Sequence, residues 1–386
     1  MLPALEPYHD RYRSELYDRV LPFWLKHSRD TEFGGCFTCL DRDGSIYDTR
    51  KYVWLNGRAA WMFARLYNTV EKRPEWLEYS RSCVHFLRRH AVMLDGHVYF
   101  SLTREGKPAF LQRKPYSAVF VALGLLEYSA ATGDAECRAE GMALFHRVCD
   151  WIGHPALLNR PSYGAPASQL ADIMVIALLA LEIVKFHDTS RYTGWLDWCL
   201  NAVKAHYDAD HRILMENARP RDLSFRSTPE GRFVCPGSAI EVAWFLLNVE
   251  RIRPNPSVRQ MLLDVIEGSL EFGWDREYGG IHYFMDIESK PMLQLEAPMK
   301  LWWPHTEAIY ALVLAYSETR DEKWLKWLEK VDAYAFSHFS DPEHGEWFGY
   351  CDRAGHLTHT LKGNNYKGAF HVPRFLLFSL QAMEKS

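Results

Sequence analysis

Residues 275–282 read Asp-Arg-Glu-Tyr-Gly-Gly-Ile-His, an acidic turn followed by a short apolar strand. Three other octapeptides have the same layout, at residues 30–37, 208–215 and 341–348, and a fainter relative begins at Asp95. The octapeptides at 208, 275 and 341 start 67 and 66 residues apart, and Asp95 lies 65 residues after the start of the first. Self-similarity at a fixed period indicates one supersecondary unit copied around or along the fold. Six units of about 65 residues would fill the 386-residue chain, with the unit expected near residue 160 degenerate.

The acidic residues of these turns resemble paired catalytic carboxylates at first sight. Their repetition favours a different role, because aspartates at such positions commonly hold a turn by accepting its backbone N–H groups. We therefore predict that Asp30, Asp208, Asp275 and Asp341 build and cap turns.

The segments between the turns are long enough for helices, and they alternate between two kinds. In the first kind one face is apolar and the other is charged. Trp324, Leu328, Val331 and Ala335, for example, recur at helical spacing with lysines and glutamates between them. Helices of this amphipathic kind are predicted at residues 5–27, 75–91, 136–153, 191–207, 257–273 and 322–339.

The second kind of segment is apolar on nearly every side, which requires burial on every side. Such helices are predicted at residues 52–69, 115–131, 168–186, 238–252, 303–318 and 370–384. Six amphipathic helices in alternation with six buried ones form an outer ring around an inner ring. We therefore predict an all-α fold, an (α/α)6 barrel of six helical hairpins, in which residues 1–386 form a single domain. Short β-strands in the repeat turns are expected over one mouth of this barrel.

Charge, hydropathy and cysteine content exclude several classes of function. A net charge of -4 and a pI near 6.5 give no electrostatic footprint for nucleic acid or an anionic membrane. The amino terminus lacks the apolar core of a signal peptide, and the most apolar run, Ile173–Leu181, is too short to cross a bilayer. Cys36 and Cys39 form a Cys-x-x-Cys pair without a second Cys or His pair nearby, so no metal or redox role is predicted for them. We expect a cytoplasmic protein.

Polar side chains interrupt the predicted inner helices near their first turns. Arg58, Glu241, Glu307 and His371 stand at such positions, and His305 lies two residues before Glu307. The first turns of the inner helices meet at one mouth of the barrel, where the helix N-termini also present spare backbone N–H groups. Burying several charges together is costly unless they pair or bind a ligand. We therefore predict a ligand pocket at this mouth.

Aromatic residues make up 14% of the chain, and two of them adjoin the predicted pocket. Trp302 and Trp303 precede His305, with Pro304 between them and the histidine. An aromatic face suits the C–H surface of a sugar, but a tryptophan here is equally suited to packing between helices. The sequence leaves both roles open.

Six separated blocks carry a specific resemblance to a known family. They are Phe-Trp-Leu-Lys-His-Ser at 23–28, Gly-Cys-Phe-Thr-Cys-Leu at 35–40, Lys-Tyr-Val-Trp-Leu-Asn-Gly-Arg at 51–58, Met-Lys-Leu-Trp-Trp-Pro-His at 299–305, Gly-Glu-Trp-Phe-Gly-Tyr at 345–350 and Lys-Gly-Ala-Phe-His-Val-Pro-Arg at 367–374. Through these blocks the chain resembles, nearly end to end, the N-acylglucosamine 2-epimerase family, whose mammalian members are also known as renin-binding protein. The resemblance implies the (α/α)6 barrel that the repeat predicts independently.

The resemblance also implies a reaction. The family interconverts N-acetylglucosamine and N-acetylmannosamine, and related enzymes epimerise other sugars at C2 or isomerise aldoses to ketoses. The implied chemistry opens the sugar ring, removes the proton next to the aldehyde and returns a proton through an enediolate, which requires bases that titrate near neutrality.

By similarity, His371 matches one of two family histidines, Arg58 would stabilise the oxyanion, and Glu241 would orient the pocket or aid ring opening. Arg232 is implied to contact sugar hydroxyls. The remaining residues expected to bind the substrate are Tyr52, Trp303, His305 and Glu307.

Cofactors and partners follow from the same reasoning. Proton transfer next to a carbonyl requires no metal and no nicotinamide, and the sequence has no metal-ligand cluster or dinucleotide fingerprint. Some family members bind ATP as an activator without consuming it, and family members often form homodimers. The expected partner is a small sugar, with no nucleic acid and no membrane.

The chain departs from the family pattern at one important position. The usual Asn-Pro-Gly-His block reads Cys235-Pro-Gly-Ser238, so the second histidine is replaced by Ser238, whose unassisted hydroxyl is a poor base. Three functions therefore stay open: an epimerase in which water, His305 or another group moves the second proton, an aldose–ketose isomerase that uses His371 alone, and a catalytically silent sugar-binding or protein-interaction relative. A glycoside hydrolase with Glu241 and Glu307 as its two carboxylates is a weaker fourth option.

Overall fold

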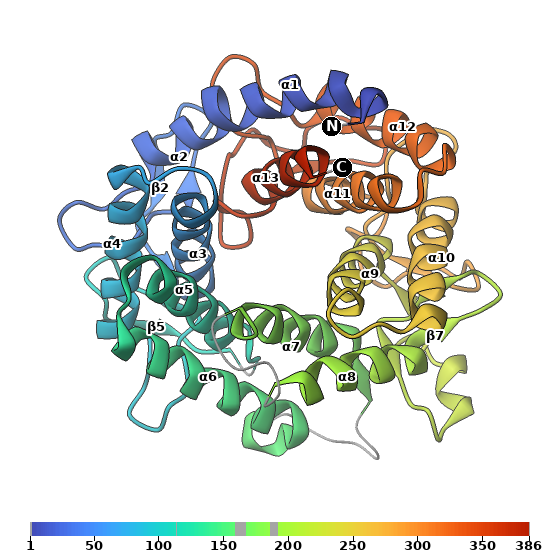
Figure 1. The fold of residues 1–386 in the computed structure, drawn as a ribbon, viewed down its shortest axis with the longest axis horizontal. Helices are drawn as coiled ribbons and strands as arrows, with labels where there is room; N and C mark the ends of the chain where they lie inside the picture. Colours follow the sequence, from blue (N-terminus) through green and yellow to red (C-terminus); the bar gives the residue numbers. More distant parts are fainter. Residues whose placement is uncertain (1, 113, 159–166, 186–191, 386) are drawn as a thin grey trace.

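The computed structural model describes residues 2–112, 114–158, 167–185 and 192–385, and within them the helices form two concentric rings (Figure 1). The inner ring consists of α3 (Val53–Thr69), α5 (Tyr116–Thr132), α7 (Leu170–Ile183), α9 (Pro236–Glu250), α11 (Trp302–Thr319) and α13 (His371–Glu384). The outer ring consists of α1 (Glu6–Ser14) with its continuation α2 (Leu21–His27), then α4 (Pro74–His90), α6 (Ala135–Gly153), α8 (Thr193–Ala202), α10 (Pro256–Gly273) and α12 (Lys323–His338). The (α/α)6 barrel predicted from the repeat is confirmed. The repeat unit expected near residue 160 and the junction of the predicted segments 168–186 and 191–207 lie outside the described residues.

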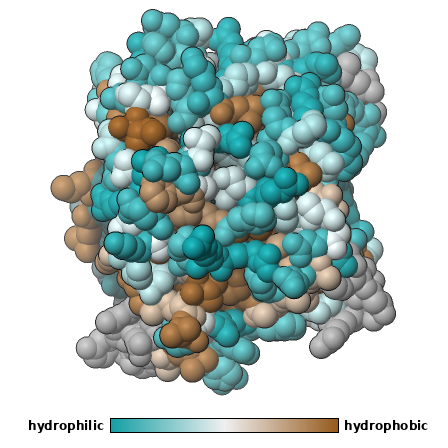
Figure 2. Space-filling model, turned by 90° about the vertical axis from the view of Figure 1, so that its left-hand side faces the viewer, coloured by the Kyte–Doolittle hydropathy of each residue, from teal (hydrophilic) through white to brown (hydrophobic). Residues whose placement is uncertain are grey.

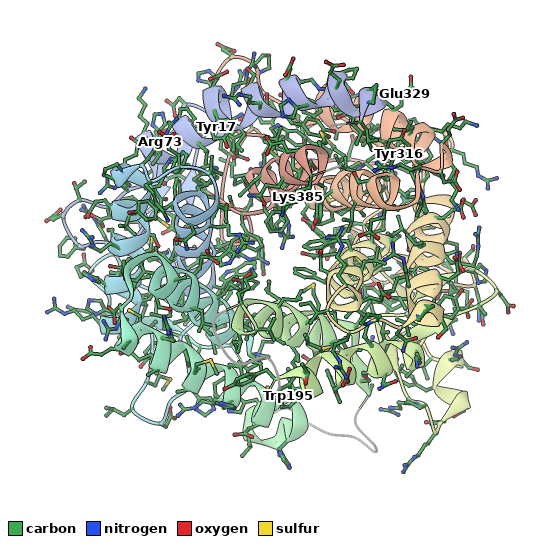
Figure 3. All side chains as sticks on the ribbon, in the orientation of Figure 1. Tyr17, Arg73, Trp195, Tyr316, Glu329 and Lys385 are labelled. Atoms are coloured by element: carbon green, nitrogen blue, oxygen red, sulfur yellow. The ribbon has the colours of Figure 1, made fainter. Side chains whose placement is uncertain are left out.

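Burial explains why the two rings have different sequences. In α5 every residue from Ser117 to Ser129 is buried, because outer helices cover one side and the other inner helices cover the rest. In the outer helix α4 the buried residues, among them Trp76, Tyr79 and Cys83, recur every three or four positions. The other face of an outer helix is exposed, as Glu329 of α12 illustrates, whereas Trp195 of α8 packs against the core (Figure 3).

The predicted helix 5–27 is interrupted, which the sequence analysis did not anticipate. A π-helical stretch, η2 (Glu15–Val20), separates α1 from α2. Pro22 stands at the start of α2 and has no N–H to donate to the carbonyl four residues earlier. A wider turn ahead of it lets the chain continue as a helix despite the missing bond.

Short antiparallel strands gather at one mouth, as predicted. The pairs are β1 (Cys39–Leu40) with β2 (Ile46–Asp48), β6 (Ser168–Gln169) with β9 (Asn217–Ala218), β7 (Tyr207–Asp208) with β8 (Ile213–Leu214), β10 (Phe233–Val234) with β11 (Met285–Asp286) and β12 (Lys300–Leu301) with β13 (Tyr350–Cys351), and β4 (Ser101–Leu102) lies between β3 (Lys51–Tyr52) and β5 (Pro108–Phe110). Strands β3, β6, β10 and β12 lead directly into α3, α7, α9 and α11. They therefore fix the N-terminal ends of these inner helices at the mouth where the site residues lie.

The repeated aspartates hold turns, which confirms their predicted role. Asp30 Oδ1 accepts the N–H groups of Glu32 and Phe33, and the other three aspartates accept turn N–H groups in the same way. Three of them also pair with a lysine that has no exposed surface: Lys51 is 2.8 Å from Asp30, Lys300 3.0 Å from Asp275 and Lys362 2.7 Å from Asp341. The repeat is thus a turn stabilised by a buried ion pair.

The outside of the barrel is mostly hydrophilic on the side drawn in Figure 2, where apolar side chains form small separate groups. No helix among the described residues is both long and apolar enough to span a membrane.

Candidate active site

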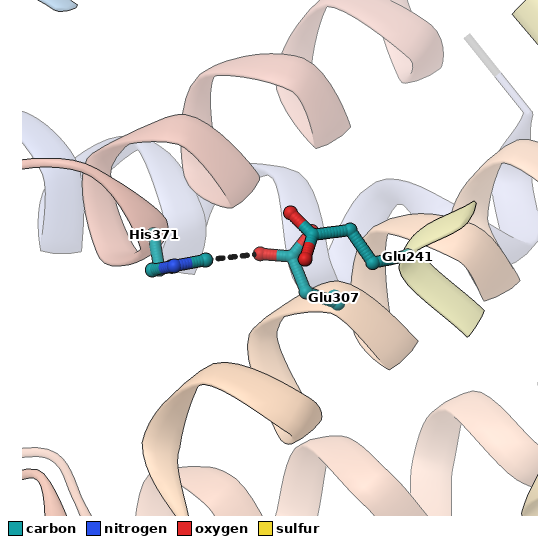
Figure 4. Close-up of side chains that lie close together, drawn as sticks. All are labelled: Glu241, Glu307 and His371. Carbon is teal, nitrogen blue, oxygen red and sulfur yellow. Dashed lines mark hydrogen bonds and ion pairs between the residues drawn. The ribbon is translucent and has the colours of Figure 1, made fainter. Parts of the chain in front are cut away.

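The first turns of three inner helices bring a compact group of charged side chains to one mouth of the barrel. Glu241 of α9, Glu307 of α11 and His371 of α13 offer ligand atoms that all lie within 4.8 Å of one another (Figure 4). All three side chains are buried. Arg58 of α3 and Arg374 of α13 complete the group, which the sequence predicted to converge.

His371 is positioned as a base. Its Nδ1 lies 2.7 Å from Glu307 Oε1, and its Nε2 lies 3.4 Å from an Arg58 Nη1. A carboxylate beside Nδ1 favours the tautomer that carries the proton there and leaves the lone pair on Nε2. Burial, with the charges of Arg58 and Arg374, lowers the pKa of His371 well below its usual value. The imidazole is therefore neutral and oriented at physiological pH.

Arg374 joins the two carboxylates. Its Nη2 lies 2.6 Å from Glu241 Oε1 and 2.7 Å from Glu307 Oε1, and the indole N–H of Trp244 donates to Glu307 Oε2 at 3.0 Å. These contacts compensate two buried negative charges. Because the guanidinium already occupies the position between the carboxylates, the trio of Glu241, Glu307 and His371 fits an ion-pair network better than a metal centre.

Arg58 has donors left for a ligand. Its guanidinium lies over the rings of Phe120, Trp54 and Phe370 at 4.1, 4.4 and 4.5 Å, and burial lowers its pKa to about 9. Its Nε is buried and donates to no acceptor among the described residues. A desolvated arginine with spare N–H groups is suited to stabilising an oxyanion.

The two adjacent tryptophans differ in exposure. Trp302 is buried, whereas Trp303 is only partly buried and its ring lies 5.9 Å from the His371 ring. Tyr283 approaches Trp303 edge-on at 6.1 Å. Of the two, Trp303 has the accessible surface that stacking on a sugar would require.

Three residues expected to bind the substrate make other contacts. Both ring nitrogens of His305 are used by the backbone, since one lies 2.6 Å from the Leu301 carbonyl and the other accepts the Ile281 N–H at 3.0 Å. Burial lowers the pKa of His305 to about 3. Arg232 pairs with Asp286 at 2.8 Å, and its guanidinium also donates to the backbone at Ser227.

Tyr52 is the third. It precedes α3 and packs against Phe100. The polar atoms of His305 and Arg232 thus have partners within the protein, whereas substrate binding by Tyr52 stays a prediction.

Ser238, where the family pattern has histidine, stands in the first turn of α9, and its hydroxyl lies beside the carboxyl of Glu216, whose pKa it acts to lower. Sequence reasoning did not single out Glu216, which lies two residues after the end of β8, next to one of the repeat turns. The available signal was a glutamate placed immediately after the apolar run Ile213–Met215.

A cavity of about 650 Å³ opens at the other end of the inner helices. Trp61, Arg65, Tyr310 and Phe378 line it, and it extends to Arg374. Lys385, at the end of α13, lies beside the central opening on this side (Figure 3). Arg374 therefore separates this cavity from His371 and its partners.

A neutral, oriented imidazole beside a desolvated arginine defines a class of enzyme that moves a proton next to a carbonyl. Comparison with known proteins identifies the family within that class. The family model for N-acylglucosamine 2-epimerase matches residues 35–372. The chain is 40% identical over 385 residues to the N-acylglucosamine 2-epimerase of Bos taurus, covering 97% of this chain and 90% of the bovine protein. The chain therefore belongs to the N-acylglucosamine 2-epimerase family.

Solved structures agree with the fold. Cellobiose 2-epimerase from Bacillus thermoamylovorans superposes with a TM-score of 0.83 at 20% identity, over 97% of this chain and 99% of the other. A D-mannose isomerase superposes with a TM-score of 0.82 at 17% identity, over 99% of both chains. At these identities the likeness shows a shared barrel and does not separate epimerase from isomerase.

Proposed function

We propose that this sugar 2-epimerase interconverts N-acetylglucosamine and N-acetylmannosamine through the ring-opened aldehyde. The observation that carries the proposal is the contact of His371 with Glu307 on one ring nitrogen and with Arg58 near the other. The 40% identity to the bovine N-acylglucosamine 2-epimerase supports the choice of sugar.

Each residue has a distinct task in this proposal. His371 Nε2 removes the proton from C2, and Glu307 holds the imidazole and stabilises the imidazolium that forms. Arg58 donates to the C1 oxygen as negative charge develops there, in an environment where its aromatic neighbours exclude water. Arg374 pairs with both Glu241 and Glu307 and holds them in place. Trp303 supports one face of the sugar.

The test is proton NMR of N-acetylglucosamine, N-acetylmannosamine, mannose and fructose, each incubated in D2O with the protein. We expect deuterium to enter C2 of the acetamido sugars and the other epimer to accumulate. His371→Ala is expected to lower this rate by about 10²–10⁴-fold, the usual contribution of a general base. His356→Ala is the matched control, because that imidazole is 81% exposed and contacts Asp352 rather than the buried charged group.

The outcomes separate the alternatives. A ketose product would indicate an aldose–ketose isomerase that uses His371 as its single base. Saturable sugar binding by calorimetry without exchange at C2 would indicate a silent binding protein.

We further propose that the protein is cytoplasmic, forms a homodimer and responds to ATP as an activator, as members of its family do. Light scattering tests the dimer, and the NMR assay with and without ATP tests the activation. A monomer at micromolar concentration, or an unchanged rate with ATP, would contradict the respective proposal.

A further inference from the structure

Inversion at C2 requires proton transfer on two faces of the same carbon. A base that removes the proton from one face and returns it to that face regenerates the starting epimer. His371 is one proton-transfer group, and the proposed reaction needs a second group on the opposite side of the sugar. The inference below rests on the proposed function.

We propose that Glu216 is this second group, working across the mouth from His371. Serine replaces the histidine of the family pattern, but the carboxyl that Ser238 contacts is itself capable of moving a proton.

The backbone places Glu216 on the wall opposite His371. Its carbonyl accepts the N–H of Leu170, the first residue of α7, at 2.8 Å, and its N–H donates to Phe233, just before α9, at 3.1 Å. Glu216 is thus fixed between the starts of α7 and α9. Figure 1 shows α7 and α13 on opposite sides of the central opening, and His371 is the first residue of α13.

The side-chain contacts bring Glu216 close to the charged group. Ser238 and Glu241 are three residues apart on α9 and therefore lie on the same face of that helix. Glu241 is in the group whose ligand atoms lie within 4.8 Å of one another. Ser238, which lies beside the Glu216 carboxyl, is about one helical turn closer to the mouth than Glu241.

Aromatic rings connect the two proposed groups along the mouth. The charge of Glu216 acts on Tyr283, whose pKa is raised chiefly by burial. The Tyr283 ring is 6.1 Å from Trp303, whose ring is 5.9 Å from His371. A sugar against Trp303 would lie between Glu216 and His371.

The environment of Glu216 suits proton transfer. Its Oε1 is buried and accepts no hydrogen bond from the described residues. Burial raises the pKa of Glu216 to about 7, and the Ser238 hydroxyl acts in the opposite direction. The other titratable groups around it are Cys235 and Tyr283, whose pKa values burial raises, so both are neutral. Near pH 7 the carboxyl is therefore available in both its protonated and its ionised form.

The protons and electrons balance over one turnover. His371 Nε2 takes the C2 proton, the C–H electron pair forms the C1–C2 double bond, and the carbonyl pair moves onto the C1 oxygen beside Arg58. Protonated Glu216 then gives its proton to the opposite face of C2 as the C1 carbonyl re-forms. The turnover leaves protonated His371 and ionised Glu216, and exchange with solvent or the reverse reaction restores the starting state.

The test compares inversion with exchange in Glu216→Gln, using the same NMR assay in D2O. We expect inversion to fall by about 10²–10⁴-fold. The epimer whose C2 proton faces His371 should still exchange that proton with solvent, and the other epimer should not. Glu230→Gln is the matched control, because Glu230 is exposed in the loop between β9 and β10. The double variant Glu216→Gln, Ser238→His should regain inversion, since it returns a titratable group to the same wall.

Inversion by Glu216→Gln within threefold of the control would overturn the inference, as would a folded, sugar-binding variant in which neither epimer exchanges. Ser238→Ala keeps the test decisive if Glu216→Gln does not fold. It removes a hydroxyl that lowers the pKa of Glu216, so the high-pH limit of activity should move upward, and an unmoved limit would also overturn the inference. A wild-type protein that inverts no sugar would instead contradict the proposed function itself.

Discussion

His371 Nδ1 and Glu307 Oε1 lie 2.7 Å apart, and this contact fixes which nitrogen of the imidazole can act as the base. Glu307→Gln keeps the shape of the side chain but removes its charge and allows its amide to face either way. We expect kcat to fall by about 10²–10⁴-fold, because the productive tautomer and the developing imidazolium both lose support. KM should change little, since Glu307 contacts the base rather than the sugar in this proposal. Steady-state kinetics with both epimers checks this, and a kcat within threefold of wild type would show that the contact is not needed.

The pH dependence of kcat/KM distinguishes two proton-transfer groups from one. His371 must be neutral to accept a proton, and its pKa is lowered well below 6.5, so the rising limb should lie below pH 6.5. Glu216 must be protonated to donate, and its pKa is raised to about 7, so activity should fall as pH rises through that value. The kcat/KM profiles of the forward and the reverse reaction should have the same bell shape, because the ratio of the two kcat/KM values is an equilibrium constant that does not depend on pH. A profile that stays flat to pH 9 would indicate a single base.

Arg58 offers a test of oxyanion stabilisation. Its plane lies among three aromatic rings, an arrangement that suits a guanidinium and not an ammonium. In Arg58→Lys, desolvation should favour the neutral amine, and kcat should fall by about 10²–10³-fold. Arg50→Lys is the control, because Arg50 is 57% exposed and pairs with Asp48, two residues earlier in the chain. Comparable rates for the two variants would remove Arg58 from the proposed mechanism.

Sequence periodicity predicted the barrel well because burial imposes it directly. The predicted apolar segments correspond to α3, α5, α7, α9, α11 and α13, with ends that differ by a few residues. They were recognised because an inner helix is apolar on nearly every face. The π-helical stretch at Glu15–Val20 was missed, because Pro22 permits either a break or a wider turn. For the site, Arg58, Glu241, Glu307 and His371 were found as charges in apolar helices.

The other site residues depend on partners distant in the sequence. The sequence around His305 does not indicate that the Ile281 N–H donates to its ring nitrogen. Glu216 was overlooked because it adjoins a repeat turn, and the acidic residues of these turns had been assigned a structural role. Its contact with Ser238 is visible only after folding.

The buried ion pair of Asp30 and Lys51 should make stability depend on acidity. Burial alone would raise the pKa of Asp30, but hydrogen bonds from Arg104, Lys51 and two backbone N–H groups outweigh it and lower the pKa to about 2. A carboxyl with a lowered folded pKa stabilises the fold above its unfolded value of 3.8, and that contribution is lost as pH falls toward 2. In Asp30→Asn the fully buried Lys51 loses its counter-charge, which should cost about 3–5 kcal/mol of unfolding free energy at pH 7.

Urea unfolding at a series of pH values checks this, with Asp10→Asn as the control because its side chain is 89% exposed. The difference in midpoint between Asp30→Asn and wild type should be largest above pH 5 and should shrink below pH 4, since the carboxyl of the unfolded wild-type chain then binds a proton that the folded state does not bind until about pH 2. A difference that stays constant from pH 7 to pH 3 would mean that the side chain contributes through shape and hydrogen bonding rather than through its charge. Asp275 and Asp341 have the same arrangement with Lys300 and Lys362, so their variants should follow the same course.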